Sequence, residues 1–213
     1  MRKLLTFVLF KINIISLKKG MFLEKDINNS APAGWIEVVC GSMFSGKTEE
    51  LIRRLKRARI AKQKVEIFKP AVDTRYDDED VVSHDQSKVS SIPVQNASQI
   101  LFYSQDIDVV GVDEAQFFGN ELVDVCMQLA NKGKRVVVAG LDMDYLGKPF
   151  GPIPLLMSTA EYVTKVHAIC MRCGNLASYS HRTIENDKLV VLGETESYEP
   201  LCRKCFAEAT NQV

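Results

Sequence analysis

Apolar runs that end in glycine or in polar turns alternate along this chain with segments of helical spacing. Four short runs rich in valine and isoleucine predict strands over residues 35–40, 65–68, 108–112 and 135–139. Residues 48–62 and 120–131 repeat apolar side chains every third or fourth position and predict helices. Their expected buried faces consist of Leu51, Ile52, Leu55 and Ala58, and of Leu122, Val125, Cys126 and Leu129. Strands that alternate with helices predict an α/β fold, with a parallel sheet covered by helices on both faces.

Three further segments do not follow this alternation. Residues 69–91 form a long polar stretch, and loops of that length are usually functional or mobile. Residues 141–158 are rich in glycine and proline, which predicts an irregular loop without a regular element. A last apolar run, residues 162–169, leads into a C-terminal segment that contains four cysteines.

The composition is that of an ordinary soluble globular protein. The chain has 213 residues, of which 46% are hydrophobic and 25% charged, enough for one good core and a small appendage. Lysine and arginine number 27 and so do aspartate and glutamate, but five of the basic residues lie in residues 1–20. The remainder therefore has 27 − 5 = 22 basic against 27 acidic residues, a net charge of −5. This acidic body argues against non-specific binding to nucleic acid.

The N-terminus has the outline of a signal peptide, with a basic start and an apolar stretch. Lys11 interrupts that stretch after seven residues, no small-x-small cleavage site follows, and the segment is too short to span a membrane. We expect either a disordered extension over residues 1–34 or a true translation start at Met21, and we favour the second. Without an export signal, we expect a cytoplasmic protein that has no contact with a membrane.

A phosphate-binding motif lies between the first predicted strand and the first predicted helix. The segment matches G-x-x-x-x-G-K-[ST] at every fixed position, with Gly41, Ser42, Met43, Phe44, Ser45, Gly46, Lys47 and Thr48. In such a loop the backbone N–H groups surround phosphate oxygens, the lysine reaches the β and γ phosphates, and the hydroxyl can bind Mg²⁺. The alternative is a chance glycine turn, which the flanking elements argue against. The motif predicts an ATP site with magnesium.

Two carboxylates follow the third predicted strand. Asp113 comes directly after the apolar run and is expected to face the metal ion. Glu114 lies one residue further and could accept the proton of an attacking hydroxyl. The alternative, a solvated acidic turn, is weakened by the phosphate-binding motif.

The six cysteines divide into two classes. Cys40 and Cys126 lie in apolar segments and are expected in the core. The other four form two C-x-x-C pairs separated by 28 residues, and they can close a tetrahedral site that we expect to hold structural zinc: Cys170, Cys173, Cys202 and Cys205. Redox dithiols or disulfides are the alternative.

Basic residues are dense on the first predicted helix. They could form a patch for phosphate or nucleic acid, but the apolar stripe leaves them on the outer side. We therefore expect a solvated face made of Arg53, Arg54, Lys56, Arg57 and Arg59.

The ordered motifs GSMFSGKT, FKPAVDTRY, SHD, VDEAQFF, GLDMDYLGKPFG and CMRC with LCRKC resemble the type II thymidine kinases, the family of cellular and bacterial thymidine kinases. The resemblance covers residues 35–206 and implies a RecA-like P-loop domain over 35–169, a small zinc-ribbon-like domain with the thymidine-binding loop over 170–206, and a tail over 207–213. It also implies a lasso loop over about 146–162. A homotetramer and feedback inhibition by dTTP are further implications.

The resemblance assigns roles to individual residues. Glu114 matches the catalytic base, and Asp113 the acid of the magnesium site. Residues matching the ATP and magnesium site outside the phosphate-binding motif are Asp73, Arg75, Asp113, Glu114, Ala115 and Gln116. Residues matching the thymidine site are Met43, Leu141, Tyr145, Leu189, Val190, Val191, Leu192, Gly193 and Tyr198. Tyr145 stands where the family usually has phenylalanine, so stacking on the base is kept and an extra hydroxyl is added.

The predicted reaction is transfer of the ATP γ-phosphate to the 5′-hydroxyl of thymidine, giving dTMP and ADP. One rival is a DNA-associated ATPase, against which stand the single nucleotide-binding domain, the acidic body and the lack of aromatic residues interleaved with basic ones. Another is a zinc-ribbon interaction module that merely binds a nucleotide.

Overall fold

The computed structural model describes residues 34–71, 80–81, 89–184 and 197–210. Of the predicted N-terminal extension the structure describes only Gly34, and of the predicted tail only residues 207–210, where α5 (Arg203–Ala209) ends. Among the residues that are described, no helix has the length and apolar character needed to cross a membrane.

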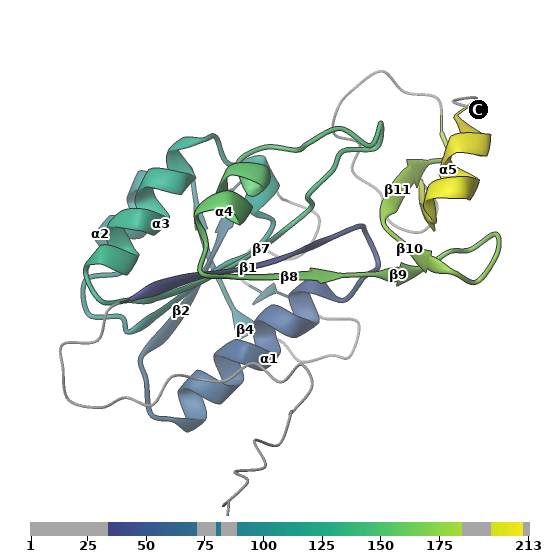
Figure 1. The fold of residues 1–213 in the computed structure, drawn as a ribbon. Coiled ribbons are helices and arrows are strands. Elements are labelled where there is room, and N and C mark those ends of the chain that lie inside the picture. Colours follow the sequence, from purple (N-terminus) through teal and green to yellow (C-terminus); the bar gives the residue numbers. More distant parts are fainter. Residues whose placement is uncertain (1–33, 72–79, 82–88, 185–196, 211–213) are drawn as a thin grey trace, which may run out of the picture. The chain divides into compact units, whose positions relative to one another are not determined.

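A six-stranded sheet forms the centre of the fold (Figure 1). Every neighbouring pair in it is parallel. Its spatial order is β5 (Ile92–Val94), β2 (Val65–Pro70), β6 (Val109–Val112), β7 (Arg135–Gly140), β1 (Trp35–Gly41) and β8 (Tyr162–Val166). The four predicted strands are all present, and they lie side by side as β2, β6, β7 and β1. Their apolar runs are explained by burial on both faces of the sheet.

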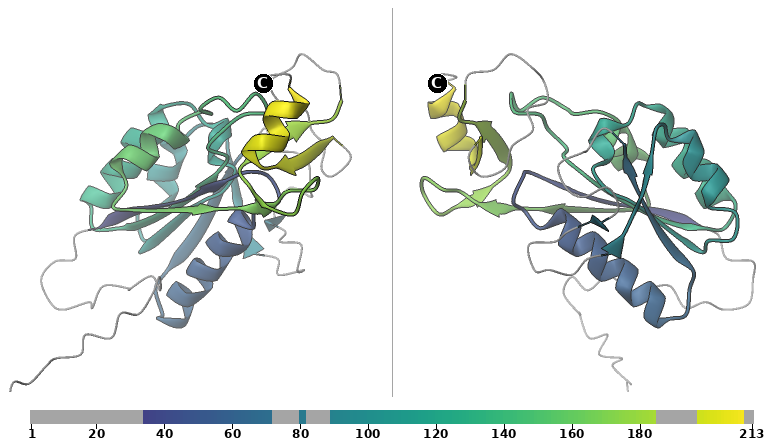
Figure 2. Two further views of the ribbon diagram at one scale, coloured as in Figure 1. Left: turned by 45° about the vertical axis from the view of Figure 1, so that its right-hand side comes forward. Right: turned by 180° about the vertical axis from the view of Figure 1, so that it is seen from behind.

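Helices cover both faces of the sheet, as Figures 1 and 2 show. Helix α1 (Lys47–Ile60) lies on one face and packs Leu51, Ile52, Leu55 and Ala58 against the sheet. The opposite face carries α2 (Ser98–Tyr103), α3 (Glu121–Asn131) and α4 (Ile153–Thr159). Both predicted apolar helix faces are buried, and so are Cys40 and Cys126. The predicted α/β fold is confirmed.

The glycine- and proline-rich segment contains a helix, so the prediction of an irregular loop over 141–158 is wrong at its C-terminal end. Helix α4 occupies Ile153–Thr159 inside that segment and inside the expected lasso. Pro152 caps the helix and Pro154 lies in its first turn, where proline is tolerated because those N–H groups have no helical partner. Ile153 and Leu156 are fully buried against the sheet, and this packing stabilises a helix that composition alone does not reveal.

The C-terminal residues form a small unit of short elements with its own apolar cluster. This cluster contains Ala168, Ala177, Tyr179, Leu201 and Phe206. Two antiparallel pairs and a helix build the unit, namely β9 (Ala168–Ile169) with β10 (Leu176–Ala177), β11 (Tyr179–Arg182) with β12 (Tyr198–Leu201), and α5 (Arg203–Ala209). The remaining short elements are β3 (Asp80–Val81), β4 (Val89–Ser90) and the 3₁₀ turn η1 (Ala115–Phe117).

One arginine of α1 lies in the interior, so the prediction of a solvated face is wrong for Arg54. Its side chain is 3% exposed and bonds Glu37 of β1 at 2.9 Å and Glu50 at 2.8 Å. Glu37 is fully buried and also accepts a hydrogen bond from Arg135 of β7 at 2.7 Å. Burial of these charges is tolerated because each is paired within the cluster.

Candidate active site and metal centre

The phosphate-binding motif occupies the turn between β1 and α1, at the carboxyl end of the sheet where ligands bind in open parallel folds. Strand β1 ends at Gly41, and α1 begins at Lys47. A Cβ atom at Gly41 would lie 2.2 Å from the Val166 carbonyl oxygen, so this position requires glycine. Phe44 and Gly46 have positive φ angles of 62° and 80°, which turn the backbone into the helix. The Ser45 hydroxyl closes the loop by donating to the Ser42 carbonyl at 2.7 Å.

Lys47 and Thr48 begin α1 with their polar groups turned into this end of the sheet. The Lys47 ammonium group donates to the Ser42 carbonyl at 2.7 Å, so it lies folded over the loop. Burial lowers the pKa of Lys47 below its usual range, while the carboxylates of Glu114 and Asp113 oppose that shift. The lysine charge is therefore close enough to both acids to interact with them.

Asp113 and Glu114 follow β6 directly. Asp113 is buried, accepts from the Thr48 hydroxyl at 3.2 Å and accepts from the Glu114 N–H at 2.9 Å. Burial and the neighbouring Glu114 charge raise the pKa of Asp113 to about 7. Glu114 has φ 49° and ψ 37°, a left-handed conformation that is rare outside glycine, asparagine and aspartate and is concentrated at functional sites.

Ala115 and Gln116 open the 3₁₀ turn η1 behind these acids. Ala115 is fully buried in the core beneath the turn. Gln116 is 2% exposed and donates from its amide nitrogen to Glu114 Oε2 at 2.5 Å. Its amide oxygen accepts from the Leu141 N–H at 2.9 Å. Gln116 therefore joins the acidic turn to the segment that follows β7.

Four of the residues expected around thymidine are described by the structure. Met43 and Leu141 are half-buried, and the Met43 N–H donates to the Ser180 hydroxyl at 2.9 Å. The Arg182 guanidinium lies 3.6 Å from the centre of the Tyr145 ring and donates to the Tyr198 hydroxyl at 3.0 Å. The Arg182 guanidinium thus contacts both Tyr145 and Tyr198. The expected residues Asp73, Arg75, Leu189, Val190, Val191, Leu192 and Gly193 lie outside the described residues.

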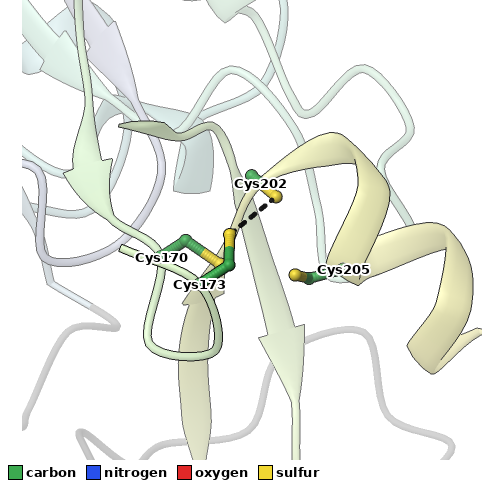
Figure 3. A group of neighbouring side chains, drawn as sticks. All are labelled: Cys170, Cys173, Cys202 and Cys205. Atoms are coloured by element: carbon green, nitrogen blue, oxygen red, sulfur yellow. Dashed lines mark hydrogen bonds between the residues drawn. The ribbon is translucent and has the colours of Figure 1, made fainter. Parts of the chain in front are cut away.

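The four cysteines of the two C-x-x-C pairs converge in the C-terminal unit (Figure 3). Cys170 and Cys173 belong to the turn between β9 and β10, and Cys202 and Cys205 to the start of α5. Their sulfur atoms all lie within 4.8 Å of one another, with 3.5 Å between Cys173 and Cys202. A tetrahedral zinc site with Zn–S bonds of about 2.3 Å separates its sulfurs by about 3.8 Å, whereas a disulfide needs about 2 Å. The geometry and the four-sulfur donor set fit zinc, and all four cysteines are free thiols.

Sequence reasoning missed Ser180, Arg182 and Asp142. Ser180 and Arg182 lie in β11, and both reach residues that the sequence had assigned to the ligand sites. Asp142 is buried two residues after the end of β7 and pairs with Lys165 of β8 at 2.5 Å. Residues 179–182 read Tyr, Ser, His and Arg, so no alternation of apolar and polar residues signals β11. No local pattern indicates which residues these side chains contact.

Comparison with known proteins agrees with this architecture. The family model described as thymidine kinase matches residues 34–206. A protein of Bacteroides thetaiotaomicron named thymidine kinase is 61% identical over 192 residues, covering 90% of this chain and 96% of that protein. A Porphyromonas gingivalis protein of the same name is 57% identical over 189 residues, covering 89% and 93%. One from a Rhodothermus species is 59% identical over 180 residues, covering 84% of each. The chain belongs to the thymidine kinase family.

Proposed function

We propose that this protein transfers the γ-phosphate of ATP to the 5′-hydroxyl of thymidine, giving dTMP and ADP. The observation that carries the proposal is the meeting of Lys47, Thr48, Asp113 and Glu114 at one end of the sheet, in a chain of the thymidine kinase family. A lysine at the start of a helix, a hydroxyl and two acids supply the groups that phosphoryl transfer needs.

Each of these residues has a proposed part in the reaction. Lys47 binds the β and γ phosphates and stabilises the charge that develops on them. Thr48 and Asp113 would hold Mg²⁺ between them, directly or through water. When bound, that ion neutralises phosphate charge and orients the γ-phosphoryl group. Glu114 accepts the proton of the 5′-hydroxyl as the oxygen attacks phosphorus.

The nucleoside is proposed to bind beside the acidic turn. Met43 and Leu141 would form an apolar wall near the 5-methyl group, and Tyr145 would stack on the base. The backbone of 189–193 would supply hydrogen bonds to the thymine edge, with Tyr198 nearby. Asp73 and Arg75 would lie near the phosphates.

Several coarser features complete the proposal. The four cysteines would hold a structural zinc ion, since a site with four protein ligands has no open position. The proposal also keeps the division of the chain into an extension over 1–34, a nucleotide-binding domain over 35–169, a zinc domain over 170–206 and a tail over 207–213. The cytoplasmic location, the homotetramer and feedback by dTTP are further parts of the proposal and rest on the family resemblance.

A kinase assay across nucleosides tests the proposal. Thymidine presents a donor at N3 and an acceptor at C4, whereas deoxycytidine presents the reverse pattern, and each mismatch buries an unpaired group. We expect kcat/KM for thymidine to exceed that for deoxycytidine by about 10² to 10⁴, and deoxyuridine to be a usable but poorer substrate. Comparable rates for thymidine and deoxycytidine would instead indicate a broader deoxynucleoside kinase. ATP turnover stimulated by single-stranded DNA and not by thymidine would indicate a DNA-associated ATPase.

A further inference from the structure

We infer that Gln116 is a positioning residue that fixes the Glu114 carboxylate and connects it to the backbone of Leu141. The inference rests on the proposed function, because it takes Glu114 as the group that accepts the substrate proton. The inference gives Gln116 a role in supporting the proton acceptor Glu114, whereas the family resemblance groups Gln116 with the ATP site.

The side-chain amide of Gln116 makes one hydrogen bond in each direction. Its nitrogen donates to Glu114 Oε2 at 2.5 Å, and its oxygen accepts from the Leu141 N–H at 2.9 Å. A backbone N–H can only donate and a carboxylate oxygen can only accept, so the chemistry of the two partners fixes the orientation of the amide. An amide offers its donor and its acceptor on separate atoms, and asparagine, the other amide side chain, is shorter by one methylene group.

The surroundings of Gln116 leave the amide little freedom to move. The residue is 2% exposed. A Cβ atom at Gly151 would lie 2.4 Å from the Gln116 carbonyl oxygen, and one at Gly140 would lie 2.9 Å from the amide oxygen. Gly140 therefore leaves just enough room for the amide, and Gly151 leaves room for the residue's own backbone carbonyl. A side chain held in this way can hold its neighbour within the narrow geometry that catalysis requires.

Glu114 needs such support because its own backbone does not favour the observed conformation. Its φ angle of 49° lies in the left-handed region, which costs a non-glycine residue free energy and persists only when neighbours hold it. Asp113 contacts the Glu114 N–H, and Gln116 contacts the carboxylate. The two contacts together fix both ends of the glutamate.

The second bond of the amide extends this arrangement to the segment after β7. Leu141 lies three residues after Val138 of the sheet and four before Tyr145, which the proposed function places over the base. A single amide therefore connects the proton acceptor to the start of the proposed nucleoside-binding segment. Gln116 reaches the reaction through Glu114, and its two contacts favour this role over direct contact with ATP.

A double-mutant cycle tests the inference. We compare wild type, Q116L, E114Q and the double variant by steady-state kinetics with thymidine and ATP. Q116L is expected to lower kcat by about 10- to 100-fold, because a displaced reacting group costs on that order, with the KM for ATP changed less than about 3-fold. In the E114Q background, the same substitution is expected to change kcat by less than about 3-fold, since the group it positions is already lost.

Two further variants make the result decisive. Q116E retains an acceptor for the Leu141 N–H but cannot donate to Glu114, so it is expected to lose at least as much kcat as Q116L, and it serves if Q116L does not fold. Q128L, at an exposed position of α3, is the matched control and is expected to behave as wild type. Thermal denaturation establishes that each variant is folded.

The opposite outcomes overturn the inference. An equal fold loss of kcat in both backgrounds would show that Gln116 acts independently of Glu114. A raised KM for ATP with unchanged kcat would show a direct ATP contact. Absence of thymidine-dependent ATP turnover in wild type would contradict the proposed function itself. The wild-type measurement therefore tests the proposed function separately from the role of Gln116.

Discussion

Thr48 Oγ1 lies 3.2 Å from Asp113 Oδ2, although the two residues are 65 positions apart in the sequence. The contact joins the first turn of α1, which follows β1, to the end of β6, across the intervening strand β7. Hydroxyl and carboxylate oxygens at this separation can become ligands of one Mg²⁺ ion with little rearrangement. The contact thus brings together two motifs of the sequence, the phosphate-binding motif and the acidic pair that follows β6.

Lys47→Ala is expected to abolish phosphoryl transfer while the protein stays folded. The ammonium group donates to the loop carbonyl of Ser42 and is not part of the apolar core, and its charge is proposed to act on phosphate. Kinase activity and thermal denaturation would be measured together, with Lys56→Ala at an exposed position of the same helix as control. Near-normal turnover by a folded Lys47→Ala variant would contradict the ATP site.

Glu114→Gln is expected to lower kcat by about 10² to 10⁴ with little change in the KM for thymidine. The substituted side chain keeps the shape of glutamate, and its amide oxygen can still accept a hydrogen bond from Gln116. It cannot take up the proton of the 5′-hydroxyl. Steady-state kinetics with Glu121→Gln, an exposed residue of α3, as control would measure the effect. If only KM rose, Glu114 would bind the substrate without acting as a base.

The stability of the magnesium-free protein should carry a pH dependence from Asp113. Burial raises the pKa of Asp113 from 3.8 to about 7, so the folded state holds this proton more tightly than the unfolded state. The stabilising contribution is complete below about pH 4 and is lost as the pH rises towards about 7. Thermal denaturation between these limits should show the fall in wild type and not in Asp113→Asn, with the exposed Asp124→Asn as control. Parallel curves for wild type and Asp113→Asn would contradict the assignment.

Removal of the metal should destabilise the C-terminal unit before the sheet. Four thiolates without an ion lose the binding free energy that stabilises a unit with so small an apolar cluster. Elemental analysis should find one zinc per chain in wild type and in Cys126→Ala, whose sulfur lies in the main core, and less in Cys173→Ala. Disulfides among the four cysteines in the native protein, with no metal bound, would overturn the zinc assignment.

The strands and the longer helices could be predicted because their signals are local. Valine-rich runs gave four strands, and regular apolar spacing gave α1 and α3. Helix α4 was missed because its seven residues include a proline and follow a glycine-rich segment, and only burial of Ile153 and Leu156 against the sheet stabilises it. Strand β5 and helix α2 are short and lay outside any clear pattern.

Long-range pairings limited what the sequence could reveal of the site. Arg54 was placed on the surface with the other arginines because its partner Glu37 is 17 positions away and belongs to another element. Motifs indicated Lys47, Thr48, Asp113 and Glu114, since their spacing reflects chemistry that recurs among nucleotide-binding proteins. Ser180 and Arg182 have no such spacing, and their positions follow only from the pairing of β11 with β12.

The buried Glu37 has a consequence for how this molecule opens. Its carboxylate accepts from Arg54 of α1 and Arg135 of β7, and Arg54 also donates to Thr164 of β8. Separation of α1 or β7 would break a hydrogen-bonded ion pair with a fully buried carboxylate, which is strongly unfavourable. Amide protons of β1, β7 and α1 should therefore exchange with deuterated solvent as a single slow group. Strand β1 leads directly into the phosphate-binding loop. The loop is therefore anchored to a strand that we expect to resist local unfolding longest.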